Sequence, residues 1–172
     1  MGGVFGVASA SDCVSDLFYG TDYHSHLGTR RGGMAVRNGT NIQRAIHNIE
    51  NSYFRTKFEP DLNRFDGGLG IGVISDTDPQ PLIVGAHLGT FGIVTVGKIN
   101  NQEDLVRRAF ARKSFFSDTA AGQVHPTEVV AMLICEADNL VAGIKNAQAA
   151  IQGSCSMLLL TDQGLFAARD RL

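Results

Sequence analysis

Met1-Gly2-Gly3-Val4-Phe5-Gly6-Val7 is the stretch that decides the fold, because it predicts a β-strand that begins almost at the first residue. Apolar residues and glycines share this strand, and glycine, which has no Cβ atom, lets a second backbone or a ligand approach closely. A strand that starts at residue 2 places its α-amino group at the end of a sheet. The amine at that end can therefore form part of a site.

Composition predicts one soluble globular domain. The chain has 172 residues, of which 44% are hydrophobic and 19% charged, and its net charge is −2, so neither nucleic acid nor an anionic membrane is an expected partner. The sequence has no apolar run long enough to span a bilayer and no signal-peptide pattern, which predicts a cytoplasmic location. The three cysteines form no CxxC pair, so we expect no disulfide framework, metal or cofactor.

Helical and strand patterns alternate along the chain. Asn38-Gly39 is a hairpin signal, Asp12 and Asn139 are plausible helix N-caps, and Pro126 fits the first turn of a helix. Together these patterns predict a layered α+β domain. We expect helices at 12–27, 52–58, 102–113, 126–137 and 140–151, and strands at 32–37, 40–47, 67–75, 82–87, 91–96, 156–160 and 165–168.

Six stretches, in order, resemble the class II glutamine amidotransferases, which are N-terminal nucleophile hydrolases, and most closely the glutaminase domain of amidophosphoribosyltransferase. The stretches are Gly3–Gly6, Asp16-Leu17-Phe18-Tyr19-Gly20, His26-Leu27-Gly28 through Val36, Gln80-Pro81-Leu82-Ile83-Val84, Thr127-Glu128-Val129, and Gly153 through Asp170. The resemblance implies a four-layer αββα sandwich over residues 1–172. It also implies that these residues form the N-terminal part of a longer protein, whose phosphoribosyltransferase-like domain would be the partner in the same chain; homo-oligomerisation is left open.

The resemblance also locates the positions of the family's glutaminase chemistry. That chemistry needs a thiol nucleophile beside a free α-amine, oxyanion donors, and charged partners for the substrate. At the matching positions the sequence has Gly2 for the cysteine, Ile74 for the carboxylate-binding arginine, Val96 for an oxyanion-stabilising asparagine, and Pro126 for the amine-binding aspartate. Only Gly97 of the oxyanion segment is kept. We therefore expect a degenerate pocket at these five positions.

One assignment stays open, because Ser117-Asp118-Thr119 repeats the family's Ser-Asp-Thr triplet eight residues early. With an insertion after it, Asp118 would line the pocket.

The main functional hypothesis is a degenerate glutaminase domain, unable to hydrolyse glutamine, with a structural or regulatory role. The alternatives are an enzyme of altered chemistry that uses the N-terminal amine of Gly2, and a small-ligand-sensing domain; whether the chain is an enzyme is left undecided.

Other candidate residues favour structural roles. Cys13, Cys135 and Cys155 lie in patterns typical of core positions. His24 and His26 do not share a helix face, which disfavours a metal pair. The glycine-rich stretch 67–72 is not followed by a helix, so a dinucleotide-binding loop is rejected.

Overall fold

The first of two four-stranded antiparallel sheets contains the N-terminal strand. The computed structural model describes residues 2–28, 30–117, 119–120 and 122–170. In it β1 pairs with β4, so that Gly3 lies opposite Ile74, and β2 and β3 form the predicted hairpin at Asn38-Gly39. The strand order is β1-β4-β2-β3, with bounds Gly3–Ala8, Leu69–Ser75, Arg31–Asn38 and Asn41–Asn48.

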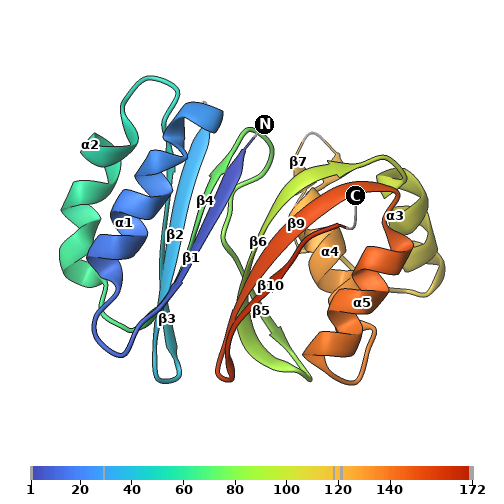
Figure 1. Ribbon diagram of the computed structural model, residues 1–172. Coiled ribbons are helices and arrows are strands. Elements are labelled where there is room, and N and C mark those ends of the chain that lie inside the picture. The colour runs from blue at the N-terminus through green and yellow to red at the C-terminus, as the bar shows by residue number, and fades with distance from the viewer. Residues whose placement is uncertain (1, 29, 118, 121, 171–172) are drawn as a thin grey trace.

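The second sheet packs face to face on the first (Figure 1). Branched apolar side chains from both sheets, among them Ile71, Val73, Val94 and Leu160, form the buried layer between them. Long apolar strands such as β9 are expected in a sheet that is covered on both faces. The strand order is β10-β9-β6-β5, with bounds Gly164–Ala168, Gly153–Thr161, Gly89–Ile99 and Leu82–Ala86.

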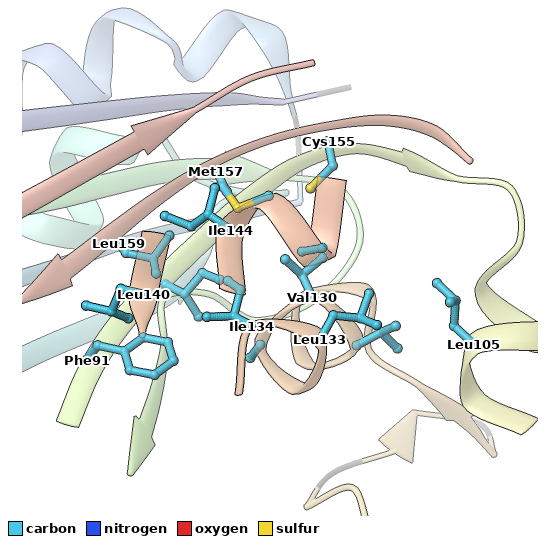
Figure 2. Packing of buried hydrophobic residues seen from close by; sticks show 14 of the residues in the cluster. Phe91, Leu105, Val130, Leu133, Ile134, Leu140, Ile144, Cys155, Met157 and Leu159 are labelled. Atoms are coloured by element: carbon cyan, nitrogen blue, oxygen red, sulfur yellow. The ribbon is translucent and has the colours of Figure 1, made fainter. Parts of the chain in front are cut away.

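Helices cover the outer face of each sheet, which completes the expected four-layer αββα sandwich (Figure 1). On the first sheet lie α1, Val14–Tyr23, and α2, Phe54–Phe58. On the second lie α3, Gln102–Ala111, α4, Pro126–Cys135, and α5, Leu140–Ala150. Figure 2 shows the apolar side chains of α4 and α5 packing on β6 and β9. None of the helices in the described part of the chain is long and apolar enough to cross a bilayer.

The predicted helices are largely confirmed, with shorter bounds. The helix expected at 12–27 ends at Tyr23 and continues as a separate 3-10 turn, Ser25–Leu27. Asp12 precedes the N-cap position, and its Oδ2 accepts a hydrogen bond of 3.2 Å from the backbone N–H of Val14. The helix expected at 52–58 begins two residues later, as α2, because its N-cap residue Tyr53 has extended backbone angles. It ends at Phe58 as predicted, where a 3-10 segment, Glu59–Arg64, with Pro60 in its first turn, follows at once.

One small hairpin was not predicted from the sequence. β7, Thr119–Ala120, and β8, Gln123–Val124, pair within the segment that we expected to be a loop. Two-residue strands are too short to show an alternating pattern, so sequence periodicity cannot reveal them.

Candidate functional site

A cavity of about 680 Å³ lies beside the start of β1. Its walls come from the segment after β4, from the ends of β6 and β9, and from the first residues of α3 and α4. Four of the predicted pocket positions meet there: Gly2, Val96, Gly97 and Pro126. The elements of the fold therefore bring together residues that are 124 positions apart in the sequence (126 − 2).

Gly2 sits too close to β4 for a side chain. A Cβ atom built on Gly2 would stand 2.4 Å from the carbonyl oxygen of Ile74 and 3.3 Å from Cγ2 of Val96. A carbon–oxygen contact of 2.4 Å is far inside van der Waals separation, so any other residue at position 2 requires the backbone to shift. The position that the resemblance assigns to the nucleophile is thus built for glycine.

Ile74 does not line the cavity with its side chain. That side chain is fully buried in the cluster between the first sheet and α1, whereas its neighbour Ser75 lines the cavity. Successive side chains of a strand point to opposite faces of the sheet. An alignment with the family that is shifted by one residue therefore assigns to the pocket a side chain that points toward the helices. Ile74 contributes its carbonyl oxygen beside Gly2 instead. Asp118, the remaining candidate, lies outside the described residues.

Backbone conformation explains why glycine occupies position 97 and proline position 126. Gly97 has φ of +154°, and a Cβ atom there would lie 2.1 Å from the carbonyl oxygen of Ser154. Pro126 is the first residue of α4, as predicted, where a missing N–H costs no helical hydrogen bond. The presence of Gly97 is therefore explained without a catalytic role.

Cys155 is among the residues that line the cavity, but its side chain packs in the core between the second sheet and α4 and α5, as sequence analysis expected (Figure 2). Cys155 is buried, and burial together with the negative charge of Asp170 raises the pKa of its thiol to about 12. The thiolate is the nucleophilic form, so near neutral pH this sulfur is protonated and unreactive. No group of three metal-ligating side chains occurs in the described part of the chain.

A buried hydrogen-bond network around Asp78 and Gln80 adjoins the cavity, and the sequence analysis assigned neither residue a role in the site. The amide of Gln80 donates from Nε2 to Oδ1 of Asp78 at 2.9 Å and to the carbonyl oxygen of Thr95 at 3.1 Å, and its Oε1 accepts from the Thr95 N–H at 2.6 Å. The hydroxyls of Thr95 and Thr127 lie 2.7 Å apart. Every buried side-chain polar atom in the described residues has a hydrogen-bond partner, which indicates a structural brace.

Two charged side chains line the cavity, Asp76 and Lys98. Asp76 accepts a hydrogen bond of 3.3 Å from the backbone N–H of Arg30. Lys98 lies directly opposite Ser154 in the β6–β9 ladder, and the Ser154 hydroxyl oxygen accepts from the Lys98 backbone N–H at 3.2 Å. Among the residues that the structure describes, the Lys98 ammonium forms no ion pair.

The fold that forms this cavity also occurs in known proteins. No protein-family model matches the sequence. The amidophosphoribosyltransferase of Methanocaldococcus jannaschii is 27% identical over 183 aligned residues, which cover 99% of this chain and 38% of the relative.

Solved structures match the whole fold. One is the glutamine phosphoribosylpyrophosphate amidotransferase of B. subtilis complexed with ADP and GMP, with a TM-score of 0.82 and 22% sequence identity. Another is described as the allosteric regulatory enzyme of purine biosynthesis, with a TM-score of 0.83 and 21% sequence identity. Each match covers 99% of this chain and 37% of the solved chain. In sequence and in fold, the chain is thus homologous to the glutaminase domain of amidophosphoribosyltransferase, an N-terminal nucleophile hydrolase fold.

Proposed function

We propose that this chain is a degenerate glutaminase domain that does not hydrolyse glutamine and has a structural or regulatory role in an amidophosphoribosyltransferase-like protein. The observation that carries the proposal is the contact of 2.4 Å between a Cβ at Gly2 and the Ile74 carbonyl oxygen. A thiol nucleophile at this position needs a side chain, and the backbone geometry leaves no room for one.

The other groups around the cavity support the same conclusion. Val96 and Pro126 have no side-chain hydrogen-bond donor for an oxyanion and no charge for the substrate's ammonium group, and both line the cavity. The thiol of Cys155 packs in the core behind the cavity wall, and it is held protonated because burial and Asp170 raise its pKa. A glutamine bound in this cavity would meet the charges of Lys98 and Asp76 but no thiolate to attack its amide.

The matched relatives suggest the wider context. The chain spans 38% of the archaeal relative, so we infer that a phosphoribosyltransferase-like domain is its partner within one protein that acts in purine biosynthesis. The three cysteines are unpaired, as is typical of a reducing cytoplasm, and we place the protein there.

A glutaminase assay tests the proposal. Incubation of the protein with glutamine is expected to release glutamate at the rate of a buffer blank, because no group is available to form the acyl-enzyme. Mass spectrometry of the same sample, after exposure to an electrophilic glutamine analogue, is expected to show no covalent adduct. Turnover above the blank that scales with protein concentration would overturn the proposal.

A further inference from the structure

We propose that the cavity binds a small organic monoanion with an apolar body, whose anionic head lies at Lys98 and Ser154. This inference rests on the proposed function, because it gives a ligand to a cavity that does not hydrolyse glutamine. A concave site of several hundred Å³ that combines apolar walls with a few polar groups is the usual form of a small-molecule site. The volume of about 680 Å³ falls in that range.

The head of the ligand is assigned from the β6–β9 ladder. Residues directly opposite each other in an antiparallel pair project their side chains from the same face, so the side chains of Lys98 and Ser154 lie side by side in the cavity wall. The Ser154 oxygen already accepts from the backbone, which leaves its hydroxyl hydrogen to donate. An ammonium beside a hydroxyl donor suits a carboxylate or a phosphate ester.

The body of the ligand is assigned from the remaining wall. Val96 lies two residues before Lys98 on β6 and therefore on the same face, and Leu27 and Pro126 add further apolar surface. Gly2 contributes only backbone atoms to the wall. An apolar body placed against these residues removes hydrophobic surface from water on both partners.

The charge of the ligand is limited to one by Asp76. Its carboxylate lines the same cavity, so a second negative group on the ligand would meet a like charge. An apolar amine with its head at Lys98 and Ser154 would meet the Lys98 ammonium, so it does not fit the same head position. The geometry thus favours a monoanion over a dianion, a cation or a neutral alcohol.

The test uses hexanoate as the probe, with hexanol and hexylamine as matched neutral and cationic compounds and hexyl phosphate as a second anion. Hexanoate is expected to raise the apparent Tm in a concentration-dependent way, because a ligand that binds only the native state stabilises it. Titration calorimetry then gives Kd. Equal binding of hexanol and hexanoate, or no binding of hexanoate, would overturn the inference. Tighter binding of hexyl phosphate, which is largely a dianion at about pH 7, than of hexanoate would also overturn it.

Variants separate a specific site from unspecific uptake. Lys98→Met is expected to weaken hexanoate binding about fivefold or more, whereas Lys98→Arg retains most of it. Lys145→Met, which changes an exposed lysine on α5, serves as the control and leaves Kd unchanged. Equal losses in the Lys98→Met and Lys145→Met proteins would contradict the assignment. Because glutamate release is measured on the same samples, failure of the glutaminase proposal is distinguished from failure of the ligand assignment.

Discussion

Oδ2 of Asp78 accepts a hydrogen bond of 3.0 Å from the backbone N–H of Thr127, in the first turn of α4. The N-cap residue of that helix, His125, makes no such side-chain bond, so a carboxylate from the loop before β5 replaces the usual capping group. A negative charge is also favourable at the positive end of the helix dipole. The bond thereby joins the loop between the two sheets to the outer helix layer.

Replacement of Asp78 tests this brace. Asp78→Ala removes the acceptor for the buried Thr127 N–H and the buried Gln80 amide, and also for the hydroxyl of the exposed Thr77. Because buried donors without partners are costly, we expect a loss of about 2–4 kcal/mol in the free energy of unfolding, measured by urea titration. Asp138→Ala, at an exposed aspartate, is the control and is expected to change it by less than about 0.5 kcal/mol. Equal effects of the two substitutions would contradict a bracing role.

Two strand glycines provide a matched pair for the packing between β2 and the same loop. A Cβ atom at Gly33 would lie 1.7 Å from the carbonyl oxygen of Gln80, whereas a Cβ at Gly85 meets nothing within 4 Å. We expect Gly33→Ala to cost about 3 kcal/mol or more, or to prevent folding, and Gly85→Ala to be nearly neutral. Thermal unfolding of both variants measures the difference in stability. A Gly33→Ala protein as stable as the Gly85→Ala protein would show that the loop moves freely away from β2.

The structural features that depend on short stretches of sequence were predicted correctly. The β2–β3 hairpin follows from Asn38-Gly39, and the cap of α5 follows from Asn139, whose Oδ1 accepts from the Ala142 N–H at 2.9 Å. Both signals involve residues that are neighbours in the chain. The four-layer arrangement was expected only through the family resemblance, because periodicity does not specify how two sheets stack.

The site was predicted less completely, for two physical reasons. Ile74 was assigned to the pocket although strand alternation places Ser75 on that face, so attention to the period of two in β4 would have identified the lining residue. Asp78 and Gln80 carry no local signal of burial. Only the tertiary fold brings them against Thr95 and Thr127, 15 to 49 residues away along the chain.

The buried thiols predict low reactivity at neutral pH. Burial raises the pKa of Cys155 to about 12, with a contribution from Asp170, and burial with the nearby Asp12 raises that of Cys13 to about 11. Because only the thiolate reacts, iodoacetamide is expected to label Cys135, which is partly exposed, before the other two at pH 8. Peptide mass spectrometry of the native protein measures the order. Fast labelling of Cys155 would show an open or electropositive environment around its sulfur.

The same shifts predict that stability declines in alkali. The unfolded chain releases thiol protons near pH 9, whereas the folded protein keeps those of Cys13 and Cys155 until about pH 11 and 12. The stabilising contribution is therefore complete below pH 9 and decreases as pH rises through that window, by at most about 1.4 kcal/mol per pH unit for each thiol. Urea unfolding at several pH values measures the slope. Cys155→Ala should make this slope shallower, and an unchanged slope would exclude Cys155 as a contributor.

Restoring a thiol at the chain start is expected not to restore a glutaminase. In Gly2→Cys the new Cβ would be forced against the Ile74 carbonyl oxygen, 2.4 Å away in the native geometry, so the sulfur cannot take a defined position without movement of β1. Gly2→Ala introduces the same Cβ without sulfur and is the matched control. Both variants should lose similar stability in thermal unfolding, and both should release glutamate at the rate of the blank. Mass spectrometry confirms in each case whether Met1 has been removed. Glutamate release by the Gly2→Cys protein alone would show that the surrounding residues still support amide hydrolysis once a nucleophile is supplied, and that the loss of function is confined to position 2.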